Sequence, residues 1–230
     1  MLFLFDIDGT LLKAGKAPRN AFIKTIKDIF DIDVENKNIS FVGKTDLSIL
    51  IEYTKPHITE KEVLTKKDEF FETFYYNFKK IYSKVDDKFL LPYVKETLYF
   101  LINKREIIGL LTGNSKKTAY EKLLPFGIKD YFKIGAFGDE EIRRENLISL
   151  AHKRAEIFFN RTIKREEIII VGDSIPDIYT AKVYNVKAII VLTGWTDRKT
   201  IEENSPDYII ENFFHFKKLY NSKIFYPVHG

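Results

Sequence analysis

The 230-residue chain has no cysteine, one methionine and one tryptophan, and it contains no apolar run long enough to cross a bilayer. Without cysteine it can form no disulfide framework, thiolate zinc site or cysteine nucleophile. The first apolar run stops at Asp6, too early for a signal peptide. We therefore expect a cytoplasmic protein with no membrane partner. The histidines lie outside every motif described below and receive no catalytic role: His57, His152, His215 and His229.

The chain also lacks a strong excess of either charge. Its 37 basic and 33 acidic side chains leave a formal charge of +4 and are interspersed along the sequence. Such a surface is typical of a protein with no nucleic-acid partner. With 45% hydrophobic residues, the chain has ample material for a core, and its length suits one α/β domain carrying a smaller inserted module.

Short apolar runs separated by segments of helical period predict an α/β fold. Such segments alternating with buried strands imply right-handed crossovers and a doubly wound parallel sheet, a Rossmann-like core. In this kind of sheet, ligands bind beyond the C-terminal ends of the strands. We expect strands at residues 2–5, 107–111, 132–137, 168–171, 188–192 and 208–210.

Residues 14–88 interrupt this alternation, because they contain helical patterns and no convincing strand. We predict helices at 19–30, 46–53 and 59–82, the last with an aromatic stripe that favours plain core over a ligand-binding surface. The chain then divides into a catalytic core, residues 1–13 and 89–230, and an inserted helical cap, residues 14–88.

Acidic and small polar residues follow three of the expected strands. Asp6 and Asp8 leave the first strand through a turn that Gly9 permits, and paired acids of this kind can bind a hard cation or divide nucleophilic and proton-transfer work. Alone, this motif is equally typical of a calcium loop or a surface turn.

The other two motifs are weaker when taken alone. Thr112, Gly113 and Asn114 precede a helix that begins near Ser115, and the stretch 171–177 runs from strand through glycine and acid into another helix. Taken alone, the first stretch is better explained as a helix N-cap, and the second could likewise be a capped turn. Together, however, three strand ends of one parallel sheet converge on one edge, which makes a phosphate-binding cradle the better interpretation.

Taken together, the three motifs resemble those of the haloacid dehalogenase-like hydrolase superfamily, whose phosphatases carry them in this order. Asp-X-Asp-Gly-Thr stands at 6–10, a strand ends in threonine at 112, and Gly-Asp-X-X-X-Asp stands at 172–177. The helical insertion after the first motif is similar to a type I cap, and the whole chain resembles the phosphoglycolate-phosphatase-like branch.

The resemblance implies a magnesium-dependent phosphatase acting on a small phosphorylated metabolite, either phosphoglycolate-like or a sugar phosphate. Asp6 would be the nucleophile that forms an aspartyl-phosphate, and Asp8 the general acid and base. The resemblance assigns Mg²⁺ to the Asp6 carboxylate, the Asp8 backbone carbonyl and Asp173, with Asp177 orienting that shell. It assigns the phosphate oxygens to the Thr112 hydroxyl and the N–H groups of Gly113 and Asn114.

The family pattern also calls for a lysine at the start of the helix after the third strand, and here the sequence departs from it. We assign Arg144 to that phosphate-binding role, because it lies seven residues before Ala151 on the helix, where the branch that this chain resembles carries arginine. Guanidinium suits the role through its permanent charge and a fork that fits phosphate oxygens. Arg143 and Lys153 are competitors, and a solvated basic face is the alternative.

Substrate choice is expected from the cap, where Gly43, Lys44 and Thr45 resemble the specificity loop of type I caps. Lys44 would meet a carboxylate or second phosphate of the substrate, unless it is an ordinary surface lysine.

Other functions are open to the same sequence. A sugar-phosphate mutase would use the same scaffold, and a phosphonate hydrolase would need a cap lysine, such as Lys44, to form a Schiff base. Dehalogenation is disfavoured, because that reaction needs neither Mg²⁺ nor a second acid such as Asp8. A non-catalytic module that binds a phosphorylated ligand is the alternative from a different class, and the intact acids argue against it.

Overall fold

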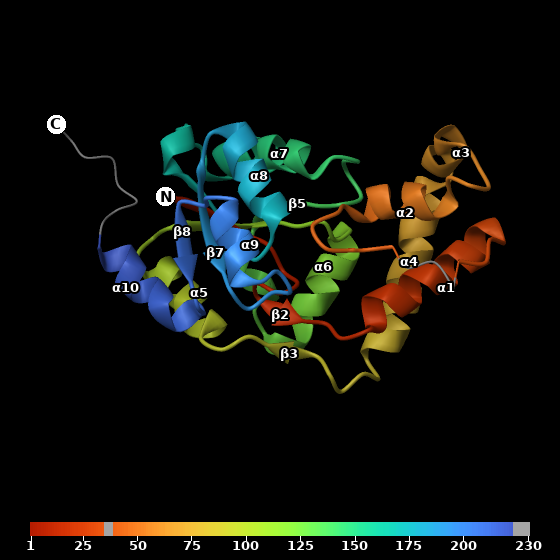
Figure 1. Cartoon of the computed structure of the whole chain (residues 1–230), viewed down its shortest axis with the longest axis horizontal. Helices are drawn as coiled ribbons and strands as arrows, with labels where there is room; N and C mark the ends of the chain where they lie inside the picture. Colours follow the sequence, from red (N-terminus) through yellow and green to blue (C-terminus); the bar gives the residue numbers. More distant parts are fainter. Residues whose placement is uncertain (35–38, 223–230) are drawn as a thin grey trace.

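The computed structural model describes residues 1–34 and 39–222. Six parallel strands form one sheet in the order β5-β4-β1-β6-β7-β8, flanked by helices (Figure 1). The α/β prediction is confirmed, and the expected strands are all present with small changes at their ends. Their bounds are Leu2–Phe5 for β1, Ile107–Leu111 for β4, Ile134–Ala136 for β5, Ile168–Gly172 for β6, Lys187–Val191 for β7 and Tyr208–Ile210 for β8.

The central strand β1 is buried on both faces because its side chains alternate between two cores. Phe3 and Phe5 face the core that contains Leu98 of α5, whereas Leu2 and Leu4 face a second core. The second core is covered by α7, α8 and α9. The helices of the domain are α5 (Val94–Asn103), α6 (Lys116–Leu123), α7 (Arg144–Phe159), α8 (Ile175–Tyr184), α9 (Arg198–Glu203) and α10 (Phe216–Asn221).

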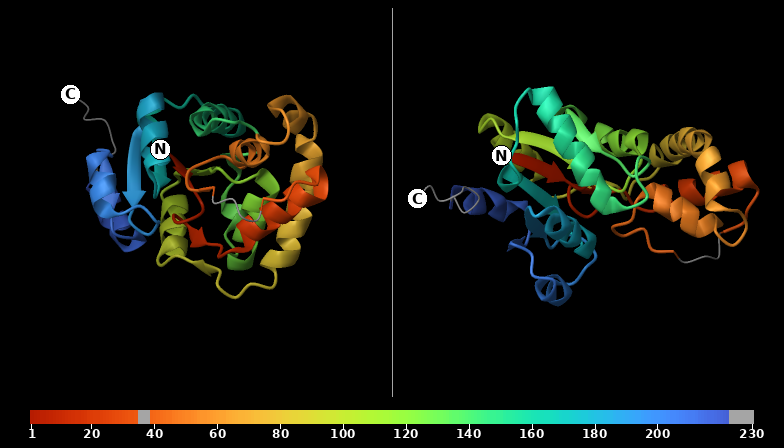
Figure 2. Two further views of the ribbon diagram at one scale, coloured as in Figure 1. Left: turned by 45° about the vertical axis from the view of Figure 1, so that its right-hand side comes forward. Right: turned by 90° about the horizontal axis from the view of Figure 1, so that it is seen from above.

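Four helices form a unit at one end of the molecule, opposite α10 (Figure 2). They lie between two short strands, β2 (Leu12–Lys13) and β3 (Phe89–Leu90), which pair antiparallel so that the chain leaves and returns side by side. Phe22 of α1 packs edge-on against Phe70 and Phe74 of α4, with centroids 5.1 and 5.0 Å apart. These helices are α1 (Ala17–Phe30), α2 (Asp46–Thr54), α3 (Glu60–Thr65) and α4 (Lys67–Tyr82).

The prediction of one helix over residues 59–82 was wrong, because the structure has two, α3 and α4. Lys66 leaves helical geometry, with φ −98° and ψ 6°, and its N–H turns back to the carbonyls of Glu62 and Val63. Helical periodicity continues through this break, so the sequence pattern does not reveal it. The aromatic stripe is core, as expected, with five buried members: Phe70, Phe71, Phe74, Phe78 and Tyr82.

Within the described residues, no helix combines the length and the apolarity needed to span a membrane. His152 has a structural role, because its ring nitrogens pair with the Tyr184 hydroxyl at 3.0 Å and the Ile163 carbonyl at 2.7 Å. His57 and His215 lie outside the cavity described below. His229 lies outside the described residues.

Candidate active site

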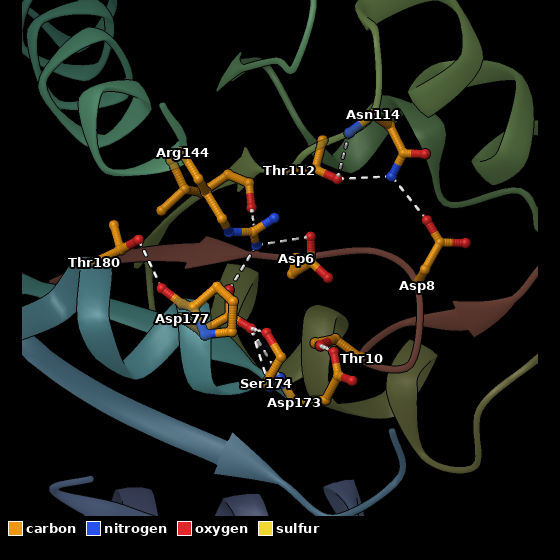
Figure 3. A network of polar contacts seen from close by, with 12 residues as sticks. Asp6, Asp8, Thr10, Thr112, Asn114, Arg144, Asp173, Ser174, Asp177 and Thr180 are labelled. Carbon is orange, nitrogen blue, oxygen red and sulfur yellow. Dashed lines mark hydrogen bonds and ion pairs between the residues drawn. The ribbon is translucent and has the colours of Figure 1, made fainter. Parts of the chain in front are cut away.

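The three motifs meet at one edge of the sheet because their strands are neighbours. β1 lies between β4 and β6, and the pairing continues one residue past β1, where the Asp6 N–H donates to the Val171 carbonyl at 2.9 Å. Asp6, Thr112 and Asp173 therefore follow the ends of three adjacent strands (Figure 3).

The turn after β1 depends on Gly9 for two reasons. Its φ of +85° is a left-handed conformation that side chains disfavour, and an added Cβ would lie 2.5 Å from Oδ2 of Asp173. The next residue, Thr10, donates its hydroxyl to Oδ1 of Asp173 at 2.9 Å. The first and third motifs are thus joined directly.

Three carboxylates gather below this turn. Oxygens of Asp6, Asp173 and Asp177 all lie within 4.8 Å of one another, and the three residues are buried. Burial, opposed by Arg144 and helped by the negative charges of Asp177 and Asp8, raises the pKa of Asp6 to about 6. Burial and the charge of Asp6 likewise hold the pKa of Asp173 well above its usual value. A buried cluster of hard oxygen donors with excess negative charge fits a divalent cation such as Mg²⁺.

Asp177 differs from the other two acids because protein donors already engage both of its oxygens. Oδ1 accepts from Arg144 at 2.5 Å, and Oδ2 accepts from the Ser174 hydroxyl at 2.6 Å and from the N–H groups of Asp173 and Ser174. The carboxylate is therefore held in one orientation at the edge of the cluster.

Arg144, the first residue of α7, reaches into the same cluster (Figure 3). Its Nη2 lies 3.1 Å from Oδ1 of Asp6, and its Nε is buried without a hydrogen-bond partner among the described residues. An unpaired buried donor of this kind is costly and indicates an acceptor that the protein itself does not supply. Arg143 and Lys153 are exposed and are not among the residues that line the cavity with Asp6.

The second motif and Asp8 form a separate network. The Asn114 amide donates both to Oδ2 of Asp8 and to the Thr112 hydroxyl, each at 2.8 Å. Lys122 of α6 completes it, because its ammonium donates to Oδ2 of Asp8 and to Oδ1 of Asn114, each at 2.6 Å. Sequence reasoning missed Lys122. The available signal was a lysine placed between Ala119 and Leu123 on the apolar face of α6.

A second residue missed from the sequence is Asp46, at the start of α2. Its carboxylate accepts the Ser115 N–H at 2.7 Å, and its own N–H donates to the Gly113 carbonyl at 2.7 Å. Burial raises the pKa of Asp46 to about 7. These contacts bind the cap to the loop that carries Thr112 and Asn114.

The predicted cap loop lies against that same loop. A Cβ added to Gly113 would fall 1.9 Å from the Lys44 carbonyl, so glycine is needed for this approach, and the Thr45 hydroxyl donates to the Ile142 carbonyl at 2.8 Å. The Lys44 ammonium pairs with Glu52 of the cap.

Cap and core together line an open cavity of about 480 Å³. Its size suits a small metabolite. The core contributes Asp6, Asp8, Asn114, Lys122, Arg144, Asp173 and Trp195, and the cap contributes Arg19, Phe41, Gly43, Lys44 and Asp46, among others.

Comparison with known proteins agrees with this arrangement. Residues 3–191 match the family described as haloacid dehalogenase-like hydrolase, and the chain belongs to that family. The expected family and fold are thereby confirmed, and the chain is a hydrolase homologous to phosphatases.

Relatives with assigned names include a pyrophosphatase, PpaX, from Halalkalibacterium halodurans, 26% identical over 91% of each chain. A phosphoglycolate phosphatase from Vibrio vulnificus is 26% identical over 92% of each chain. Another, from Nitrosococcus oceani, is 28% identical over 56% of each chain.

Among solved structures, a candidate phosphatase from Clostridium difficile is 26% identical with a TM-score of 0.63, covering 95% of this chain and 97% of that chain. CbbY from Rhodobacter sphaeroides, solved with phosphate, shares the fold, with a TM-score of 0.69 at 16% identity, covering 92% of this chain and 94% of that chain.

Proposed function

We propose that this chain is a magnesium-dependent phosphatase that hydrolyses a small phosphorylated metabolite through an aspartyl-phosphate on Asp6. The observation that carries the proposal is the placing of the Asp6 carboxylate between the buried acid Asp173 and the buried cation Arg144. With a divalent cation held at Asp173, a carboxylate so placed would have positive charge on two sides, and that charge would offset its repulsion from a phosphate.

The first half-reaction uses Asp6 and Asp8. An Asp6 oxygen bonds to phosphorus while the bond from phosphorus to the ester oxygen breaks, and Asp8 gives its proton to the departing oxygen. In the second half-reaction Asp8 takes a proton from water, the water oxygen bonds to phosphorus, and the bond to Asp6 breaks. The unpaired Nε of Arg144 is suited to a phosphate oxygen. We assign the other phosphate oxygens to Thr112 and to the N–H groups of Gly113 and Asn114, the last of which here donates to the Thr112 hydroxyl at 3.3 Å.

The carboxylates of Asp6 and Asp173 and the Asp8 carbonyl would hold Mg²⁺, with Asp177 fixed by Arg144 and Ser174 to orient the shell. When bound, the ion would neutralise charge on the nucleophile and the phosphate and align them. Because Asp177 already accepts four hydrogen bonds, an orienting role suits it better than a direct one.

The alternatives receive less support. A Schiff base requires a cap lysine whose amine is free to reach the substrate carbonyl, and the Lys44 ammonium is paired with Glu52 instead, which disfavours a phosphonate hydrolase. A non-catalytic binding module would not require a general acid beside the nucleophile. A sugar-phosphate mutase shares the same first step and is separated from a phosphatase only by its products.

The test is a panel of phosphate esters that includes 2-phosphoglycolate, pyrophosphate and sugar phosphates, assayed with Mg²⁺ and with a chelator. We expect phosphate release that requires Mg²⁺ and is lost in Asp6→Asn, since a neutral amide is neither a nucleophile nor a good ligand for a hard cation. An isomerised sugar phosphate without net phosphate release would identify a mutase. Full turnover by Asp6→Asn would overturn the mechanism.

A further inference from the structure

Lys122 is a buried cation within the cavity that no sequence motif assigns. Only 2% of its side chain is exposed, although lysine is among the residues least often buried. Burying an ammonium is costly unless it is paired with good geometry, and here two strong acceptors lie at 2.6 Å: Oδ2 of Asp8 and Oδ1 of Asn114. The ammonium is thus fixed against the proposed general acid.

The packing of α6 determines where this side chain ends. Ala119 and Leu123 beside it are fully buried, and the Tyr82 hydroxyl of the cap donates to the Lys122 carbonyl at 3.3 Å. The methylene groups of Lys122 are therefore buried among apolar side chains, and its ammonium lies at the cavity wall beside Asp8.

The two oxygens of Asp8 have different surroundings. Oδ2 accepts from both Lys122 and Asn114, whereas Oδ1 has no hydrogen-bond partner among the described residues. Two donors on one oxygen hold the carboxylate in a single orientation, and the other oxygen is left to carry a proton.

We propose that Lys122 is a positioning residue that holds Oδ2 of Asp8 and so presents Oδ1 to the oxygen that leaves or attacks phosphorus. This inference rests on the proposed phosphatase function. Lys122 acts through Asp8, and its loss is expected to affect the proton transfers while leaving phosphate binding intact.

The choice of leaving group separates these effects. An alkyl phosphate expels an alkoxide that needs the proton from Asp8, whereas p-nitrophenyl phosphate expels nitrophenolate, a stable anion that needs none. Hydrolysis of the aspartyl-phosphate needs Asp8 as base with either substrate. In Lys122→Met we therefore expect a burst of about one nitrophenolate per active site followed by slow turnover. With an alkyl phosphate from the panel, kcat falls on the order of 100-fold and KM changes little.

Matched variants make the test specific. Lys116→Met removes an exposed lysine from the same helix and should behave as wild type, and Lys122→Arg should recover part of the rate because it restores the charge. Inorganic phosphate binding, followed by fluorescence of the single tryptophan, Trp195, which lines the cavity, should be preserved in Lys122→Met. Circular dichroism checks folding, and Lys122→Gln serves in its place if the methionine variant does not fold.

Several outcomes would overturn the proposal. Wild-type turnover of the alkyl phosphate by Lys122→Met would remove any role for the lysine. Loss of the burst together with loss of phosphate affinity would make Lys122 a phosphate ligand instead. If the wild-type protein hydrolyses no ester of the panel, the proposed function itself fails, and the two failures are distinguished by the wild-type assay.

Discussion

At the scale of single residues, the Arg144 guanidinium both stabilises the buried acids and offers a donor for the proposed phosphate. It pairs with Asp177 at 2.5 Å and with Asp6 at 3.1 Å, and its buried Nε is left over. Removing it leaves two buried carboxylates without their cation, which typically costs about 3 to 5 kcal/mol of stability. Activity and stability must therefore be measured together for any substitution here.

We expect Arg144→Ala to lower kcat/KM on the order of 100 to 1,000-fold, the usual effect of deleting a charge contact in the transition state. Arg144→Lys should recover part of the rate, because it restores the charge but not the fork. Steady-state kinetics of folded protein, with unfolding followed in urea, are the measurement. Arg143→Ala, which removes an exposed side chain, is the control and should retain wild-type rates. Normal turnover by Arg144→Ala would place the required cation elsewhere.

The residues that sequence could place are those that directly follow strands. Asp6, Thr112 and Asp173 were predictable because parallel strands end at one edge, so a strand assignment alone brings them together. Lys122 and Asp46 reach the same place from a helix face and from the cap. Their positions depend on how helices pack on the sheet, which a one-dimensional pattern does not contain.

At the scale of elements, the N-terminus of α2 and the loop after β4 act as one unit. Asp46 exchanges backbone and side-chain hydrogen bonds with Gly113 and Ser115, and the Leu47 N–H donates to the Gly138 carbonyl at 2.9 Å. The hydrogen bonds from the cap therefore hold the loop expected to bind phosphate in place. A change in these hydrogen bonds is expected to shift the position of that loop.

This contact predicts a pH dependence. Burial raises the pKa of Asp46 to about 7, with Asp139 and Asp8 adding to the shift and the Ser115 N–H and Lys122 opposing it. An acid whose folded pKa lies above its unfolded value, near 4, stabilises the fold most at low pH, and that contribution is lost as pH rises toward 7. Relative to Asp46→Asn, the wild-type protein should lose about 2 to 3 kcal/mol of unfolding free energy between pH 5 and pH 7.5.

Urea unfolding of both proteins across this range checks the prediction, since other groups titrate equally in both. Asp130→Asn, at an exposed position outside the site, should instead run parallel to the wild type. Parallel curves for Asp46→Asn would mean that Asp46 is already ionised at pH 5.

Elements themselves were largely predictable, because continuous apolar runs bounded by polar residues identify buried strands. The missed break at Lys66 shows the limit: both α3 and α4 keep helical periodicity, and only the local backbone geometry separates them.

At the scale of the whole molecule, the buried acids of residues 1–34 and 39–222 gather at the junction of cap and core: Asp6, Asp46, Asp173 and Asp177. The cavity there is lined from both, and the clustered acids Asp6 and Asp173, which follow strand ends, lie in its lining, with Asp177 of α8 beside them. Such an arrangement is unfavourable for folding without a cation, because each buried carboxylate raises the cost of ionising the others. Stability of the entire fold should therefore depend on the metal.

We expect Mg²⁺ at about 100 times its dissociation constant to add about 2.7 kcal/mol to the unfolding free energy, because it binds the native protein and not the unfolded chain. For a chain of this length that corresponds to a rise of roughly 5 to 10 °C in Tm. Thermal unfolding with Mg²⁺ and with a chelator measures it.

Asp173→Asn should show a higher Tm than the wild type in chelator, since one of three mutually repelling buried charges is gone. The same variant should gain little from Mg²⁺, because an amide is a weaker ligand for a hard cation than a carboxylate. Asp130→Asn, which alters an exposed acid outside the cavity lining, should keep the full metal response. An equal rise in Tm for the wild type and Asp173→Asn would show that the ion stabilises the protein from another site.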